Sequence, residues 1–225
     1  MKKGLRKEAF MGTLKKTTIK EQVCDLIRQR ILDQTYTFGE KINMLELSQE
    51  LGVSNSPIRE ALSILESEHL ITFVPNAGPK VIQIDEKIFE EVQQTARILL
   101  IGSYEQCLQQ GLIPQLILEM EKHLSRQKAL IGDTSPESGH AFAKIAIEFD
   151  VSLIKILKNE TLEGLYAGFF NLLYLVVLYD HQNSDTDRAM NVAEHEQILA
   201  ALKNGEPTAV KTQLQLHFSR TIAAP

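Results

Sequence analysis

Residues 52–62 read Gly52-Val53-Ser54-Asn55-Ser56-Pro57-Ile58-Arg59-Glu60-Ala61-Leu62, and this stretch decides the fold of the first third of the chain. Its glycine is suited to ending one helix, and its proline is suited to beginning another, because the first helical turn leaves its N–H groups unpaired. Apolar residues on both sides recur at helical spacing. The sequence therefore predicts helices over 45–51 and 56–69, joined by a tight turn as in a helix-turn-helix.

A further helix is predicted upstream. From Thr18 to about Gln34 apolar residues recur at helical spacing, and Thr18 with Glu21 forms the pattern of a capping box. Residues 1–17 show no such period. The first twenty residues carry seven Lys and Arg against Glu8 alone. We expect 1–17 to be a basic flexible arm, which could follow DNA phosphates or be simply a solvated terminus.

A β-hairpin is predicted directly after the second helix of the pair. Residues 71–74 and 80–84 alternate as strands, and Pro75-Asn76-Ala77-Gly78-Pro79 between them is a turn sequence. Three helices and a hairpin within 18–84 predict a winged helix-turn-helix.

After Asp85 the sequence changes character. No strand pattern recurs, and Gly, Pro and Asn separate about six helical segments, at 87–110, 114–130, 137–158, 161–181, 186–204 and 207–222. Residues 85–225 are therefore predicted to form an all-helical bundle, and the chain as a whole to be mainly α. The segment 165–179 is apolar nearly all round, so we expect it to be the central, fully surrounded helix.

Composition excludes several classes of protein. The 225 residues are 44% hydrophobic and 24% charged, as in ordinary globular chains. No apolar run reaches the ~18 residues of a membrane span, and no signal peptide is recognisable. Two cysteines in different predicted helices fit a reducing cytoplasm. The net charge is -5, but residues 1–84 carry 12 basic and 10 acidic residues whereas 85–225 carry 12 and 19.

The helix-turn-helix suggests which residues read DNA. The N-terminal residues of a recognition helix face base edges in the major groove, where Arg pairs with guanine and Asn with adenine. A glycine at the wing tip allows the backbone to approach DNA closely. The alternative is a capped surface helix with a local Arg59–Glu60 pair. The predicted DNA-binding residues are Ser54, Asn55, Ser56, Arg59, Asn76 and Gly78.

Over residues 39–81 the chain resembles the DNA-binding domain of the GntR family of bacterial repressors, with helix, turn, proline and wing in register. The resemblance implies a homodimer that binds a double-stranded inverted repeat. Two positions depart from the family pattern. Asn55 stands where an Arg usually follows the Val-Ser, and Leu45 stands where some members have an Arg. The operator is therefore expected to differ from the commonest family sites.

Residues 87–222 resemble the ligand-binding FCD domain of the FadR subgroup, most clearly over Glu194–Glu206 and at His217-Phe218. The resemblance implies a ligand-responsive regulator. Many such domains hold a divalent metal with one Asp and three His, and bind a small carboxylate beside it. In this chain the family's Asp position is Ala146 and its first His position is Asp150. One ligand is thus missing and one is exchanged.

Helical spacing supports the remaining ligands. Asp150, His195 and His217 each share a helix face with apolar residues, so three predicted helices would turn an acid and two imidazoles inward. Such a set suits a transition metal with open positions, and zinc, nickel or manganese is expected. A hydrogen-bonded polar cluster in the core, or direct contact of these residues with the effector, is an equal alternative.

Three further residues are candidates for effector binding. Arg97 lies where the FCD family usually has an Arg, and could hold a carboxylate through two hydrogen bonds. It could equally be a surface residue. Asn171 and Tyr174 interrupt the apolar segment and could line a pocket.

Three other functions are alternatives. One is a regulator whose site has decayed and answers to no ligand. A regulator could sense the metal ion itself. A metalloenzyme is the weakest alternative, because His195-Glu196 begins like the HExxH zinc motif but Leu199 occupies the second His position. The sequence therefore predicts a cytoplasmic transcriptional regulator, most often a repressor in this family, and not an enzyme.

Overall fold

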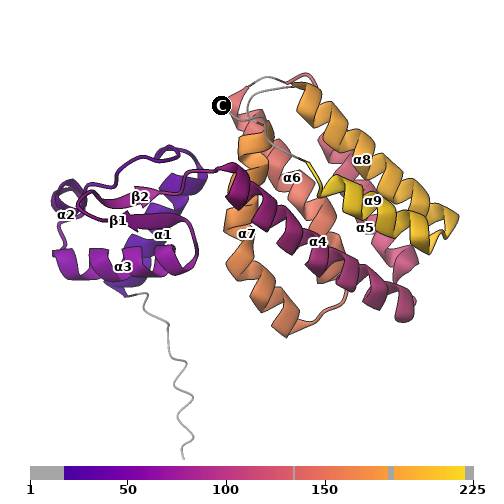
Figure 1. The fold of residues 1–225 in the computed structure, drawn as a ribbon, viewed down its shortest axis with the longest axis horizontal. Coiled ribbons are helices and arrows are strands. Elements are labelled where there is room, and N and C mark those ends of the chain that lie inside the picture. Colours follow the sequence, from indigo (N-terminus) through magenta and orange to yellow (C-terminus); the bar gives the residue numbers. More distant parts are fainter. Residues whose placement is uncertain (1–17, 134, 182–184, 221–225) are drawn as a thin grey trace, which may run out of the picture.

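The computed structural model describes residues 18–133, 135–181 and 185–220. The predicted basic arm at 1–17 lies outside this range. Figure 1 shows a small winged-helix part joined to a larger bundle of helices. The elements, in chain order, are α1 (Ile19–Leu32), α2 (Met44–Leu51), α3 (Asn55–Ser67), β1 (Ile71–Val74), β2 (Gly78–Val81), α4 (Glu86–Gln109), α5 (Ile113–Lys128), α6 (Pro136–Lys155), α7 (Glu160–His181), α8 (Asp185–Asn204) and α9 (Pro207–His217).

The winged-helix part forms as its sequence predicts. Thr18 and Glu21 make both hydrogen bonds of the capping box at the start of α1. Helix α2 ends at Gly52, whose φ of +64° is the left-handed conformation that glycine adopts without strain. Helices α1 and α3 pack against each other over a continuous apolar core. Its fully buried side chains include Ile27, Ile31, Ile58, Leu62, Leu65 and Leu70.

The wing is a two-stranded antiparallel hairpin in which Ile71 pairs with Val81 and Val74 pairs with Gly78. Strand β2 starts two residues earlier than predicted and ends at Val81, not at residue 84. The N–H of Ile82 instead bonds the carbonyl of Leu70, which fastens the exit of the wing to the residue just before β1.

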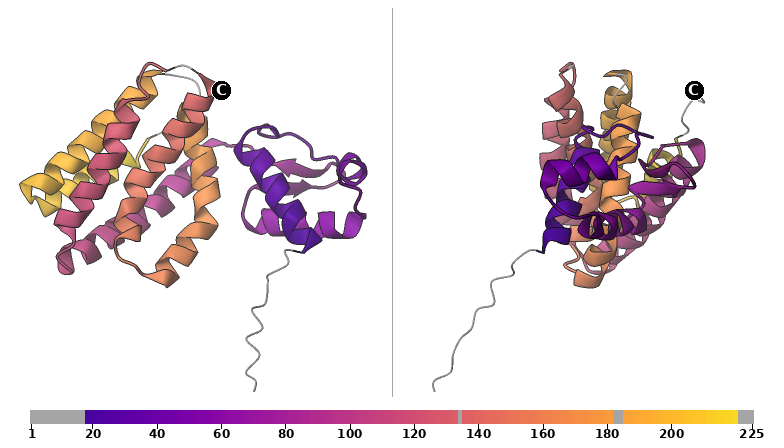
Figure 2. Two further views of the ribbon diagram at one scale, coloured as in Figure 1. Left: turned by 180° about the vertical axis from the view of Figure 1, so that it is seen from behind. Right: turned by 90° about the vertical axis from the view of Figure 1, so that its left-hand side faces the viewer.

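Helix α6 is the centre of the bundle. It packs against α4, α5, α7 and α8, and its side chains from Phe142 to Ile154 are mostly buried. The expectation that 165–179 would be the central, fully surrounded segment is wrong. Helix α7 lies at the edge of the bundle nearest the winged-helix part (Figures 1 and 2), and Leu165 is 66% exposed.

Helix α7 therefore carries an apolar outer face. Over Glu160–Asp180 it is long and apolar enough to cross a membrane by length and composition, a test that core helices also pass, and 28% of its most apolar window is buried. An exposed apolar side chain such as Leu165 on an otherwise apolar helix is typical of an interaction site. Part of the face meets the winged-helix part, where the rings of Phe38 and Tyr179 make an edge-to-face contact with centroids 5.6 Å apart.

The two parts join at Asp85, whose side chain accepts a hydrogen bond from the N–H of Ile88 and caps α4. The proposed domain limits, 18–84 and 85–225, stay predictions.

Candidate functional site

The N-terminus of α3 is open to solvent. Ser54 is its N-cap residue, and the Ser54 side chain makes no capping hydrogen bond. Asn55, Ser56 and Arg59 are all exposed on the first two turns. Glu60 accepts a hydrogen bond from the Ser56 hydroxyl and pairs with Lys20. The geometry leaves polar and cationic side chains on the surface where a recognition helix meets bases.

The wing tip lies in the turn between β1 and β2. Asn76 and Gly78 have φ values of +62° and +89°, the left-handed conformation expected of a tight turn. Space around Gly78 is open, so DNA could approach its backbone. On α2, Leu45 is 62% exposed and presents an apolar side chain where some family members have an Arg.

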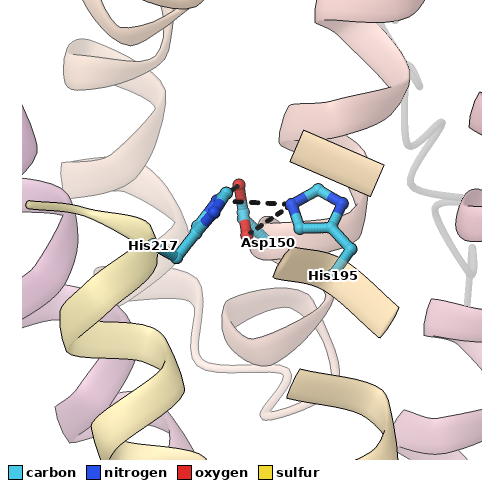
Figure 3. Close-up of side chains that lie close together, drawn as sticks. All are labelled: Asp150, His195 and His217. Carbon is cyan, nitrogen blue, oxygen red and sulfur yellow. Dashed lines mark hydrogen bonds and ion pairs between the residues drawn. The ribbon is translucent and has the colours of Figure 1, made fainter. Parts of the chain in front are cut away.

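Deep in the bundle, Asp150 of α6, His195 of α8 and His217 of α9 come together, as predicted (Figure 3). All three are buried, and one ligand atom from each lies within 4.8 Å of the others. The Nε2 atoms of the two histidines are 3.3 Å apart. Asp150 Oδ1 is 3.6 Å from His195 Nε2, and Asp150 Oδ2 is 3.5 Å from His217 Nε2. We call these residues the triad.

Hydrogen bonds on the far side of each ring fix the imidazoles. His195 Nδ1 lies 2.7 Å from Gln127 Oε1, and the Gln127 amide donates in turn to Asn191. His217 Nδ1 lies 2.6 Å from Glu194 Oε2. Because both partners are oxygen acceptors, each Nδ1 is assigned a proton, and each ring turns its Nε2 atom toward the triad.

The two Nε2 atoms and the Asp150 carboxylate face one another in a buried site, which favours a positive charge among them. Burial alone would lower the pKa of His217, but Asp150 and Glu194 raise it to about 9. Burial raises the pKa of Asp150, and His217 opposes that shift. Among the described residues, nothing donates a hydrogen bond to Asp150 Oδ1. A proton on His217 or a bound metal ion would satisfy this arrangement.

The donor set fits a metal. In a tetrahedral site with bonds of ~2.0–2.1 Å, neighbouring ligand atoms lie roughly 3.4 Å apart. The two histidine Nε2 atoms, 3.3 Å apart, match this spacing. Asp150 turns a different oxygen to each ring, at 3.5 and 3.6 Å, and one ligand atom from each of the three residues lies within 4.8 Å of the others. Ligand histidines in proteins almost always donate their other N–H to an oxygen, as both do here. The triad can therefore hold a divalent ion with one or more positions left for another ligand.

A small cavity adjoins the triad. Its volume is about 40 Å³, and Ala146 and Asp150 lie in its wall with His217 and Arg220. That is room for roughly three water molecules. Ala146, one turn before Asp150, contributes only a methyl group, so the missing ligand leaves space beside the triad.

The predicted effector residues do not gather at this cavity. Arg97 lies in an adjoining surface depression with Glu90 and Glu91, which shares Gln93, Phe218 and Arg220 with the cavity. Tyr174 lies in a groove between α1 and the bundle, and its hydroxyl is 2.8 Å from His140 Nδ1. Asn171 is half-buried on α7 and lines none of the cavities described here. Their roles in effector binding stay predictions.

Sequence reasoning missed three residues that organise the triad: Gln127, Glu194 and Arg220. Arg220 donates through Nε and Nη2 to Glu194, and through Nη1 to Asp180 at 2.9 Å. A signal existed for Gln127, because it continues the apolar face of α5 formed by Leu116, Met120 and Leu124. A polar residue on such a face needs a buried partner.

Comparisons with known proteins agree with both parts. The family model for bacterial regulatory proteins of the gntR family matches residues 19–81, and the FCD domain model matches residues 112–220. A gluconate operon transcriptional repressor from Bacillus licheniformis is 32% identical over 201 residues, covering 87% of this chain and 79% of that protein. The Uxu operon regulator of Haemophilus influenzae is 25% identical over 214 residues, covering 88% and 78%.

The fold is shared with solved structures. A putative GntR transcriptional regulator from Rhodococcus sp. RHA1 superposes with a TM-score of 0.70 at 17% identity, covering 90% of this chain and 94% of that one. At this identity the likeness concerns the fold alone.

Proposed function

The chain belongs to the GntR family of bacterial transcriptional regulators, with an FCD domain as its second part, and we propose that it is a repressor released by a small carboxylate bound with a divalent metal. The family is one of DNA-binding regulators and not of enzymes, so the metalloenzyme alternative is set aside. The observation that supports the metal is the convergence of Asp150 and two histidine Nε2 atoms, each ring oriented by an acceptor.

DNA recognition is assigned to α3 and the wing. Asn55 and Arg59 are exposed where base edges would lie, and the open backbone at Gly78 can meet a phosphate. Asn55 replaces the family's usual Arg, and Asn pairs with adenine where Arg pairs with guanine. We therefore expect an adenine, in place of a guanine, at one position of each half-site. The operator is proposed to be an inverted repeat, because a dimer with two-fold symmetry reads two-fold sites.

The exposed apolar face supports a dimer. Ile98 of α4 is 64% exposed, and it lines the same hollow as Leu162 of α7, one turn before Leu165. Gly102 on α4 and Gly168 on α7 have open space where a side chain would stand, so another helix could approach closely. We infer that a second copy of the chain covers this face.

The proposed setting is the bacterial cytoplasm, where the operator lies. Cys24 and Cys107 are buried and free, as is usual in a reducing compartment. The chemical role proposed for the metal is to polarise and orient a carboxylate, which would occupy a coordination position that the three protein ligands leave open.

The test begins with selection of genomic DNA fragments by the purified protein, followed by binding measurements on the selected operator. Small carboxylates are then screened for release of the protein from DNA, with and without removal of metal by a chelator. Release that requires both acid and metal supports the proposal. Release by metal alone would identify a metal-ion sensor instead, and failure to select any DNA sequence would contradict the proposal as a whole.

A further inference from the structure

The triad is closed off from solvent in this structure. His195 is 0% exposed, Asp150 4% and His217 6%. The adjoining cavity of about 40 Å³ is bounded by residues of α4, α6, α7, α8 and α9 and by the chain that follows α9. An ion that enters or leaves the triad therefore has to displace part of this wall.

One section of the wall separates the cavity from the surface depression beside it. The depression has a volume of about 340 Å³. Gln93, Phe218 and Arg220 line both hollows, so they form the partition between them. We call the segment Phe218–Arg220 the strap. It follows the last helix, α9, whose final residue His217 belongs to the triad (Figure 1). Movement of the strap would therefore open the cavity to the surface beside a triad residue.

A side-chain amide holds the strap in place. Gln93 of α4 donates through Nε2 to the carbonyl of Arg220, at 2.6 Å, and Gln93 Oε1 accepts from the Arg220 N–H, at 3.1 Å. The amide thus pairs with the main chain of the strap as a neighbouring strand would. Among the described residues, Gln93 makes no hydrogen bond to the triad. Its bonds therefore act on the position of the strap and not on the ligand side chains.

The charge of Arg220 acts in the same direction as the latch. Its Nε and Nη2 donate to Glu194, and its Nη1 donates to Asp180 at 2.9 Å. With the strap in place, this cation stands between the depression and the triad, where it repels an incoming metal ion. Withdrawal of the strap would remove the cation and leave both carboxylates free to attract the ion.

The strap is also the part of the wall that moves at the lowest cost. The helices of the wall pack against one another along the bundle, so shifting one of them would disturb the core. The strap has three residues and lies outside every described helix. Its opening would break the bonds to Arg220 and expose the ring of Phe218, which contacts His217 and is 6% exposed. Local openings that break few contacts are the ones that proteins make most often.

We propose that the strap is the gate through which a divalent metal ion enters and leaves the triad, and that Gln93 is its latch. This rests on the proposed function, since the triad has to bind the ion. It goes beyond that function because the triad sets the affinity for the ion, whereas the strap sets the rate of exchange.

Zinc exchange in the full chain, measured in both directions, tests the gate. Release is followed by mixing zinc-loaded protein with a chromophoric chelator at several concentrations, and uptake by mixing metal-free protein with zinc and a fluorescent indicator. In Gln93→Leu, uptake and release are both expected to become at least ~10-fold faster, because two ordinary hydrogen bonds contribute about that factor to the closed state. The zinc affinity, which is the ratio of the two rates, should stay nearly unchanged.

Gln94→Leu is the matched control. Gln94 is the next residue of α4, is exposed, and lines the depression but not the cavity, so this variant should exchange zinc as wild type does. Equal rates in Gln93→Leu and wild type would overturn the proposal. Faster release with unchanged uptake would also overturn it, because that pattern means a weakened triad and not a faster gate.

A second measurement detects opening without any metal. Ala146→Cys places a thiol in the cavity wall, where a reagent such as methyl methanethiosulfonate fits only when the wall opens. Mass spectrometry of peptides separates this thiol from the buried Cys24 and Cys107. Adding Gln93→Leu is expected to speed its labelling at least ~10-fold, and adding Gln94→Leu should not. Equal labelling in all three proteins would overturn the gate.

The gate and the proposed function fail in different ways. Zinc that binds at the triad but exchanges equally fast in wild type and Gln93→Leu would overturn the gate alone. A folded wild-type protein that takes up no zinc would contradict the metal in the proposed function, and the gate for that metal with it.

Discussion

His195 and His217 face each other through Nε2 atoms 3.3 Å apart, and each ring is held from behind by an acceptor at its Nδ1. The orientation of the rings is therefore set by Gln127 and Glu194 before any ion binds. Such preorganisation lowers the free-energy cost of binding, because ligand side chains do not have to be ordered at that moment.

Gln127 gives the first prediction. Gln127→Leu removes the acceptor for the His195 Nδ1–H but no ligand, so metal affinity is expected to fall by about 10–100-fold without being abolished. Zinc titration against a chromophoric chelator measures it. Ser103→Ala, which removes a buried hydroxyl of α4 that donates to the carbonyl of Leu99, is the control. Unchanged zinc affinity in Gln127→Leu would show that His195 does not bind through Nε2.

The space at Ala146 gives the second prediction. Ala146 lies in the cavity wall, one helical turn before Asp150. Ala146→Asp would place a fourth ligand there, so we expect tighter zinc binding and a weaker response to carboxylates, because the added ligand takes the open position. Ala146→Ser controls for added volume. An Ala146→Asp protein with unchanged zinc affinity would place the ion elsewhere.

On the DNA side, Arg59→Ala is expected to weaken binding to the selected operator by about 1–3 kcal/mol and to relax preference for one base pair in each half-site. Arg126→Ala, a change on the bundle surface where Arg126 pairs with Glu148, should leave DNA binding intact. Fluorescence anisotropy across operator variants distinguishes the two effects. A uniform loss over all sequences would assign Arg59 to a phosphate contact instead.

The proposed dimer face is tested at Leu165. Leu165→Glu puts a charge on the apolar surface of α7 without disturbing the core, since this side chain is 66% exposed. We expect a monomer in sedimentation equilibrium, with the melting temperature of each protomer little changed at high dilution. The matched change Leu216→Glu, at an exposed residue of α9, should stay dimeric. A dimeric Leu165→Glu protein would move the interface elsewhere.

Sequence patterns were sufficient for the winged helix because its boundaries depend on local chemistry. The capping box at Thr18 and the left-handed Gly52 each act within a few residues. Helical spacing also predicted correctly that Asp150 and the two histidines face the interior of the bundle. It could not show which residues hold them, since Gln127 and Glu194 are oriented by contacts distant in sequence. Helical spacing also placed α7 wrongly at the centre of the bundle, because an apolar sequence does not show whether its side chains are covered by the rest of this chain.

The central claim is that the triad holds a divalent metal, and elemental analysis by plasma mass spectrometry tests it most directly. Wild-type protein dialysed against zinc and then against metal-free buffer is compared with Asp150→Ala and His195→Ala. We expect about one metal per wild-type chain, none in either variant, and a gain of roughly 2.7 kcal/mol in wild-type stability at a free zinc concentration 100 times the dissociation constant. A folded wild-type protein that retains no metal, or variants that retain as much as wild type, would contradict the account.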